Sequence, residues 1–330
     1  MSAEALYGKR RTLVIAVALL LSAVSISAQV STRTSELRIG VITPARTPTK
    51  SESSALRGIR LGAAEAKQTA HLFGREVELY EADGDGRAHG AIAAADFLAT
   101  RHKVQVLIGT SAADADNLSR FAEQRGLIFL NIASRSDALR TACRRHSFHI
   151  EASDATYANA WRLSLAGAAR PMATTKPPGA IALWDESLAR FGASQINDRF
   201  RAATGAGMDG PGWAGWVAIK IVSEAALRAK SAQVAAILNY LEQPTTRFDG
   251  HKGWQLGFRG ADHQLRQPLY MVVRPHTVPR QSRASALPGA APRIEDVPDL
   301  RASVAAEENP DSLLDGIIPE SAPRCRWSAG

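Results

Sequence analysis

Polar residues that could bind a ligand follow two of the apolar runs in this sequence. Gly109, Thr110 and Ser111 come directly after the apolar run 104–108 and precede a segment with helical spacing. Ser111 and Asp114 have the spacing of a capping box, which satisfies the exposed backbone N–H groups of a helix start. Such N–H groups also attract carboxylates. On spacing alone, a structural cap is the favoured interpretation and a binding loop is the alternative.

A second polar loop follows the next apolar run. Asn131-Ile132-Ala133-Ser134 comes after residues 127–130 and has hydrogen-bonding side chains at both ends. Thr43 holds a similar place at the end of the first apolar run. In open α/β sheets, ligands gather at the carboxyl ends of the strands, so these loops should border one crevice. Ordinary loop polarity explains the same residues equally well.

A glycine-rich turn after the second apolar run imitates two other binding motifs. Gly84-Asp85-Gly86 with Gly90 is similar to a dinucleotide fingerprint, but Asp83 and Asp85 would repel a pyrophosphate. Read as a calcium loop, the segment has Ile92 where a bidentate glutamate is required. A tight turn is the favoured interpretation.

The sequence contains no recognisable catalytic or metal-binding set. Cys143, His146 and His149 lack the spacing of a zinc finger, and on a strand the two histidines would face opposite sides. There is no G-x-S-x-G elbow, P-loop or H-E-x-x-H motif. We therefore expect no catalytic residues, no metal and no cofactor, and an enzyme is the least favoured class.

The charge of the chain is basic but scattered. Its 330 residues carry a formal net charge of +8, and a basic balance can indicate a nucleic acid, a membrane surface or an acidic partner. No run of Lys and Arg is interleaved with aromatic residues. We therefore expect no nucleic-acid binding.

Residues 1–28 have the features of a secretory signal peptide. The basic residues 9–11 precede the apolar run 13–24, and residues 25–28 are small enough for cleavage. The apolar run is shorter than the roughly 18 to 20 residues of a spanning helix, so a membrane anchor is the weaker alternative. We expect a periplasmic mature chain without a membrane span.

From residue 37 onward, apolar runs alternate with helical stretches, as is typical of a parallel sheet covered on both faces. Strands are expected at 37–43, 76–82, 104–108 and 127–130. Helices are expected at 56–70, from the turn at 83–86 to about residue 100, and at 112–125. The second half is less regular. Strands are expected there at 146–150 (crossing), 180–183, 248–258 and 268–273, and helices at 157–168, 188–203, 213–230 and 233–241. Residues 275–330 should form an extended, partly disordered tail.

Four segments of the first half together resemble those of a known family. They are residues 37–41, Gly58-Ile59, residues 106–111 and the loop 131–134. Together they resemble the amino-terminal lobe of branched-chain amino acid binding proteins, which are type I periplasmic solute-binding proteins. The resemblance implies an α/β fold with one complete doubly wound parallel-sheet lobe, here residues 29–142. It also implies that Ser111 and Ala112, and Ala133 and Ser134, contact the ligand.

Further segments support a narrower resemblance. They are residues 143–149, Trp184 with 191–200, residues 262–268, and residues 319–320 with 324–326. They are similar to the binding proteins associated with pyrroloquinoline-quinone-dependent alcohol dehydrogenase systems. That resemblance implies a disulfide between Cys143 and Cys325, the only cysteines in the chain; two free thiols are the alternative.

The second lobe, residues 143–274, departs from the family. Residues 168–180 run almost directly from a helix to a strand, so most of the second sheet is expected to be missing and the lobe to be shortened. Hinge closure over a ligand would then be incomplete. Tyr157 and Trp184 are the candidate ligand contacts on that side.

These resemblances imply a periplasmic solute-binding component. It would deliver an unidentified small solute to an ABC-type permease or serve an alcohol-oxidation system. The alternative is an accessory or scaffold protein of a quinoprotein dehydrogenase system with a degenerate ligand cleft.

Overall fold

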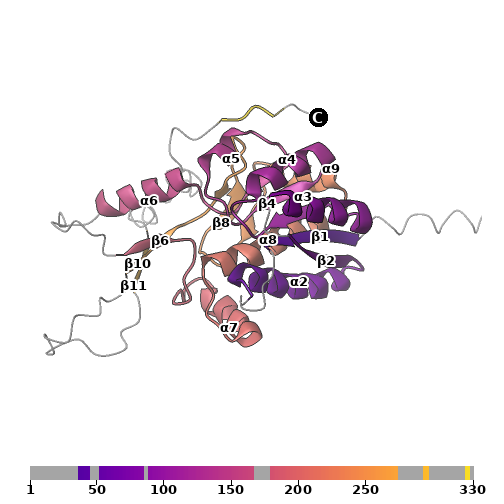
Figure 1. Ribbon diagram of the computed structural model, residues 1–330. Coiled ribbons are helices and arrows are strands. Elements are labelled where there is room, and N and C mark those ends of the chain that lie inside the picture. The colour runs from indigo at the N-terminus through magenta and orange to yellow at the C-terminus, as the bar shows by residue number, and fades with distance from the viewer. Residues whose placement is uncertain are drawn as a thin grey trace, which may run out of the picture.

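The computed structural model describes residues 36–44, 52–84, 88–166, 179–273, 293–296 and 324–327. Figure 1 shows a body built on a central sheet, with helix α6 and a few small strands projecting to one side. The expected signal peptide, residues 1–28, lies outside the described residues. Of the expected tail, only residues 293–296 and 324–327 are described.

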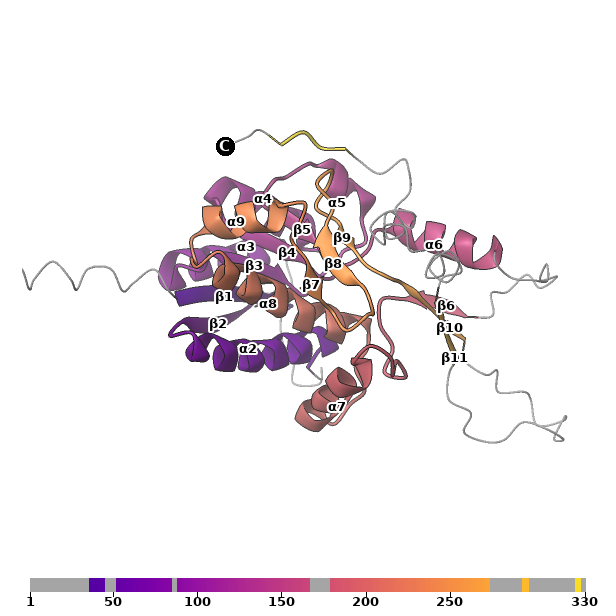
Figure 2. The ribbon, with the colours of Figure 1, turned by 180° about the vertical axis from the view of Figure 1, so that it is seen from behind.

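Five parallel strands form the central sheet in the order β2-β1-β3-β4-β5 (Figure 2). They are β1 (Glu36–Thr43), β2 (Glu76–Asp83), β3 (Val106–Gly109), β4 (Ile128–Asn131) and β5 (Ser147–His149). The first four confirm the strands expected from apolar spacing. The fifth lies within residues 146–150, where a crossing strand was expected, and it pairs in parallel with β4. The fold class is α/β, as expected.

Helices cover both faces of this sheet. The described helices are α2 (Ser54–Leu72), α3 (Ala88–Phe97) extended by the π-helical turn η3 (Leu98–His102), α4 (Ala115–Arg125), α5 (Asp137–Thr141), α6 (Asp154–Ala166), α7 (Ala193–Thr204), α8 (Gly210–Arg228) and α9 (Val234–Glu242), of which α6 lies away from the sheet. Successive residues of a strand point to opposite faces. Val41 and Ile108 accordingly join a core with α2 and α8, whereas Ile42 and Leu107 join one with α3 and α4.

Two helices begin later than the sequence indicated. The capping box at Ser111 and Asp114 is wrong, because α4 starts at Ala115 and its N-cap Asp114 makes no side-chain capping bond. Helix α7 starts at Ala193 rather than near residue 188. Phe191 and Gly192 precede it with φ angles of 56° and 80°. This left-handed backbone cannot continue a right-handed helix.

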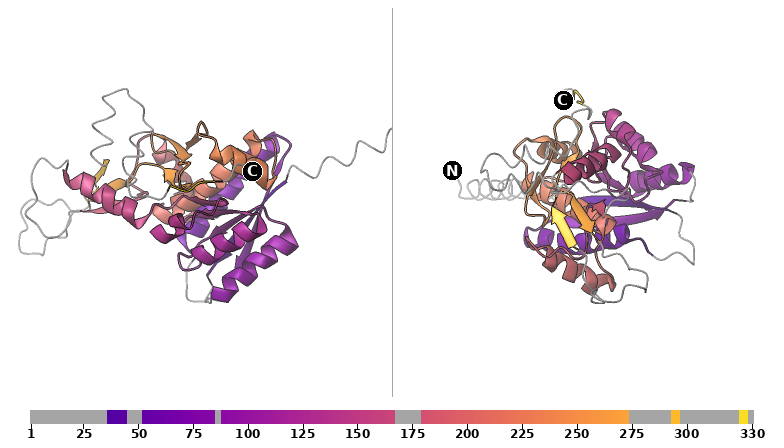
Figure 3. Two further views of the ribbon diagram at one scale, coloured as in Figure 1. Left: turned by 90° about the horizontal axis from the view of Figure 1, so that it is seen from above. Right: turned by 90° about the vertical axis from the view of Figure 1, so that its left-hand side faces the viewer.

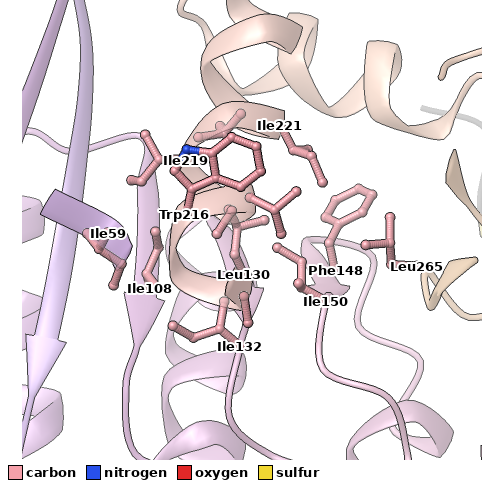
Figure 4. Packing of buried hydrophobic residues seen from close by; sticks show 14 of the residues in the cluster. Ile59, Ile108, Leu130, Ile132, Phe148, Ile150, Trp216, Ile219, Ile221 and Leu265 are labelled. Carbon is pink, nitrogen blue, oxygen red and sulfur yellow. The ribbon is translucent and has the colours of Figure 1, made fainter. Parts of the chain in front are cut away.

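Helices α2 and α8 pack with their backbones in contact, on the core face shown in Figure 4. A Cβ atom on Gly58 would lie 1.9 Å from the carbonyl oxygen of Gly212, and one on Gly215 would lie 2.3 Å from that of Ala55. The two helices also begin together, because the Asp209 carboxylate caps α8 and accepts a hydrogen bond from Ser54 Oγ at 2.5 Å. The second half of the chain is thereby joined to the first.

Two small antiparallel sheets complete the described structure. One lies on the body and contains β7 (Phe248–Asp249), β8 (Gln255–Phe258) and β9 (Leu265–Arg266); the other contains β6 (Ala180–Ala182), β10 (Tyr270–Val273) and β11 (Arg293–Asp296). Figures 2 and 3 show that the second one lies with α6 away from the body. The lobe limits at residues 142 and 274 stay a prediction, although β5 and α8 join the same sheet and core as the first half.

Cys143 and Cys325 form a disulfide, as the resemblance implied, with their Cα atoms 5.4 Å apart. The tail segment around Cys325 also makes non-covalent contacts with the body. The Cys325 N–H donates to Ala261 O at 2.5 Å, and Trp327 stacks on His263 with ring centroids 4.4 Å apart. The indole of Trp327 donates to Gly260 O at 2.7 Å. Residues 324–327 are therefore attached beside β9.

We expect Gly58→Ala to destabilise the protein. At an unconstrained helical site, alanine is better than glycine by roughly 0.8–1 kcal/mol. Here the new methyl group would overlap a carbonyl oxygen of α8, which cannot move alone, and overpacking of this kind costs about 1–3 kcal/mol. The free energy of unfolding, measured in urea, should therefore fall. Gly260→Ala is the control, because a Cβ there meets nothing within 4 Å; equal stability of both variants would contradict this account.

Candidate functional site

The polar loops identified in the sequence lie side by side at the carboxyl edge of the central sheet. Ile42 pairs with Gly109, and Gly109 pairs with Asn131, so β1, β3 and β4 end at the same level. Thr43 and the loops 109–112 and 131–134 therefore leave the sheet together. The structure thus brings all eight expected ligand residues to one edge.

The loop after β3 has backbone groups that could receive a ligand. Thr110 is tied down, since its N–H and its hydroxyl both donate to Ile42 O, at 3.0 and 3.2 Å. In the part of the chain that the structure describes, the N–H groups of Ser111, Ala112 and Ala113 donate to no acceptor, and Ala112 is exposed. Adjacent unpaired N–H groups of this kind attract an anionic group such as a carboxylate.

Two of the expected residues serve the fold. Thr43 is buried and its hydroxyl donates to the Asp83 carboxylate on β2. A Cβ on Gly109 would lie 2.7 Å from Leu118 Cδ1, so glycine there allows α4 to pack on the sheet. The contacts of both residues lie within the protein.

Asn131 shapes the loop after β4. It is fully buried, and its Oδ1 accepts hydrogen bonds from the N–H groups of Ala133 and Ser134, at 3.3 and 2.9 Å. Its Nδ2 donates to Ser134 O at 2.8 Å. The Ser134 hydroxyl accepts a hydrogen bond from Ser136 N–H at 3.3 Å. Of the residues in this loop, Ala133 is the one that stays partly accessible.

Arg140 also holds the loop after β4 in place. No sequence pattern indicated this residue. Its side chain is buried and donates to Ser134 O and Ser136 O at 2.9 Å each. It also donates to Glu151 O at 2.5 Å and to Gln264 Oε1 at 3.1 Å. Burial lowers the pKa of the Arg140 guanidinium to about 10, so it stays charged at neutral pH. A charge that satisfies several carbonyl oxygens at once fixes the loop geometry.

A buried carboxylate lies at the next position along the sheet edge, after β5. Glu151 accepts hydrogen bonds from the Tyr157 hydroxyl at 2.8 Å and from Ala152 N–H at 3.0 Å. Burial raises the pKa of Glu151, despite the Arg135 guanidinium 3.9 Å away. Arg135 is half exposed and lies over the Tyr157 ring, 4.0 Å from its centroid. This edge therefore offers cationic, hydroxyl and N–H groups together.

Tyr157 and Trp184, the expected contacts from the second lobe, both have partners inside the protein. The Tyr157 hydroxyl donates to Glu151, and the Trp184 indole donates to Asn197 Oδ1 at 2.9 Å. Trp184 is also buried and stacked on Trp213, with ring centroids 5.9 Å apart. Their contacts are those of core residues.

Asn131→Ala should destabilise the protein, because it leaves the N–H groups of Ala133 and Ser134 without their acceptor. Buried polar groups left unpaired cost about 1–3 kcal/mol. Ser111→Ala removes a hydroxyl with no partner in the described part of the chain and should leave stability unchanged. Urea unfolding of both variants tests this. A stable Asn131→Ala variant would show that the loop keeps its shape without the side chain.

Glu151→Gln should flatten the pH dependence of stability. The pKa of Glu151 is higher in the folded protein than its ordinary value of 4.5, so the folded state binds the proton more tightly. That contribution is complete below the unfolded pKa and is lost as pH rises through the folded pKa. From pH 5 to pH 8 the wild type should therefore lose more unfolding free energy than the variant. Glu78→Gln, at an exposed β2 position, is the control; parallel curves for wild type and Glu151→Gln would contradict the prediction.

Among the described helices, none combines the length and the apolar character that crossing a membrane requires. A search among curated proteins found no match to this sequence. Residues 36–173 match the family model described as periplasmic binding protein. This match contains the central sheet, both polar loops and α6.

Solved structures of similar fold share low sequence identity with the chain. A periplasmic binding protein from Burkholderia mallei is 13% identical, with 88% of this chain and 98% of that chain covered and a TM-score of 0.65. An ABC transporter substrate-binding protein from Desulfitobacterium hafniense is 15% identical, with 73% and 98% covered and a TM-score of 0.63. An ABC transporter solute-binding protein from R. palustris, in complex with benzoate, is 13% identical, with 72% and 93% covered and a TM-score of 0.57. The chain therefore has the α/β fold of type I periplasmic binding proteins, and its residues 36–173 match that family's model.

Proposed function

We propose that this protein is an exported, periplasmic substrate-binding component of an ABC-type transport system. It binds a small solute at the carboxyl edge of the central sheet. The observation that carries the proposal is the row of N–H groups at Ser111, Ala112 and Ala113, which have no acceptor among the described residues and lie beside a loop held rigid by Asn131 and Arg140. Similar proteins of this fold are substrate-binding proteins of ABC transporters.

The chemistry of the edge favours a solute with a carboxylate. Unpaired N–H groups and the half-exposed Arg135 guanidinium both prefer an anionic group. Benzoate, the ligand of the R. palustris protein, is such a carboxylate. Thr43, Gly109, Thr110, Asn131 and Ser134 support the edge in this proposal, and Ser111, Ala112 and Ala133 face the solute.

The few described elements opposite the carboxyl edge favour a second candidate function. In the described residues beyond the body there are only α6 and the three-stranded sheet of β6, β10 and β11. This partial wall in the described residues also suits an accessory or scaffold protein of a quinoprotein dehydrogenase system with a degenerate cleft. Permease genes beside the gene would favour transport, whereas dehydrogenase and cytochrome genes alone would favour the accessory function.

Binding should be detectable but weak. Ligand pockets usually bury roughly 70–90% of a ligand's surface, which one wall cannot do, so we expect micromolar or poorer affinity. In a thermal-shift screen of amino acids, alcohols, aldehydes and short acids, a carboxylate should raise the melting temperature most, because ligand binding stabilises the native state.

Ser111→Ala should weaken that binding, and the double variant with Ser134→Ala should weaken it further. Ser136→Ala is the control, because it removes a hydroxyl of the same kind at an exposed position nearby. Nanomolar binding that survives the double substitution would rule out this site. The absence of any shift in the whole screen would favour the accessory function.

A further inference from the structure

Among the described residues, three connections link the body of the molecule to the small sheet of β6, β10 and β11 (Figure 2). The first leaves β5 through Ile150 and leads to α6. The second returns from β6 through Leu183 to α7. The third leads from β9 through Gln267 and Pro268 to β10. Any movement of the small sheet relative to the body must bend these three segments.

Two buried side chains hold all three connections together. Lys252, in the turn between β7 and β8, is 1% exposed. Its Nζ donates to Leu183 O at 2.8 Å, to Gln267 Oε1 at 2.9 Å and to Pro268 O at 3.0 Å. Gln267 is 4% exposed and donates from Nε2 to Ile150 O at 2.6 Å. One hydrogen-bond network therefore includes an atom of every connection.

The contacts of the Lys252 Nζ atom are those that an ammonium group makes. Its three protons are donated to three oxygens, and the Nζ atom lies 3.9 Å from the centroid of the Trp213 ring, which favours a cation. Burial acts in the opposite direction and lowers the pKa of Lys252. If one connection moved away from the others, the buried cation would lose an acceptor, and such a loss is costly. The three connections are therefore energetically coupled.

We propose that Lys252 and Gln267 form a buried latch that keeps the three connections in register, so that the small sheet and α6 move as one body. The latch consists of these two side chains and the carbonyl oxygens of Ile150, Leu183 and Pro268. It does not depend on which solute binds or on whether the protein serves transport. Bending between the two parts is then confined to residues on either side of the latch.

Gln267→Glu tests one half of the latch. The carboxylate keeps an acceptor for Lys252 but loses the donor to Ile150 O. Hydrogen exchange of the full chain, followed by mass spectrometry, reports the Ile150 and Glu151 amides, which both donate to Asn131 O. We expect exchange there to be about tenfold faster, as for the loss of one buried hydrogen bond, with wild-type rates in α2 and around Leu183. Gln233→Glu, an exposed position before α9, makes the same charge change and should alter neither region.

Lys252→Met tests the other half, with Lys220→Met on α8 as its control. We expect faster exchange around both Leu183 and Leu269 in Lys252→Met, with α2 unchanged. Unchanged exchange at Ile150 in Gln267→Glu would overturn the proposal. So would an equal increase in every peptide, including α2, because that is a general loss of stability. If Lys252→Met fails to fold, Gln267→Glu decides alone.

Discussion

The close approach of α2 and α8 is the contact on which the other features of the molecule depend. Glycines at positions 58, 62 and 215 let backbone atoms of the other helix approach to where a Cβ atom would lie. Dispersion attraction between closely packed atoms then replaces that of large interlocking side chains. Because Asp209 also joins the two helix starts, α8 is fixed both along its length and at its end.

Helix α8, which packs on α2, also contributes to the junction between the body and the small sheet. Helix α8 supplies Trp213, whose ring lies under the Lys252 ammonium and whose indole donates to Gly250 O at 3.0 Å. Trp213 also stacks on Trp184, which belongs to the connection after β6. The position of the small sheet is thus set by a helix that is itself positioned by α2. A change in the α2–α8 contact would therefore be felt at the junction.

The carboxyl edge of the sheet contains two kinds of polar group: those that hold a loop in shape and those that a ligand could contact. Asn131 and Arg140 are buried with all their contacts directed to the protein, and they give the loop after β4 one shape. The loop after β3 has the opposite character, because the N–H groups of Ser111, Ala112 and Ala113 donate to no acceptor among the described residues. Fully paired groups rigidify a structure, whereas unpaired ones can receive a ligand. A binding edge needs both kinds side by side.

The sequence by itself determined the strands of the central sheet, most helices and the two loops at the sheet edge, because apolar spacing and chain order are local and a parallel sheet places all its carboxyl ends together. The prediction of a capping box at Ser111 and Asp114 was wrong, because short polar patterns of this spacing also occur in front of helices that start later in the chain. Only the tertiary structure decided which polar residues are buried. Arg140 and Gln264 are separated by 124 positions, and Lys252 and Leu183 by 69, so no local pattern could announce either pair. Whether a polar side chain supports the fold or faces a ligand depends on where its partner atoms lie in space, and that is set when α8 folds back onto α2.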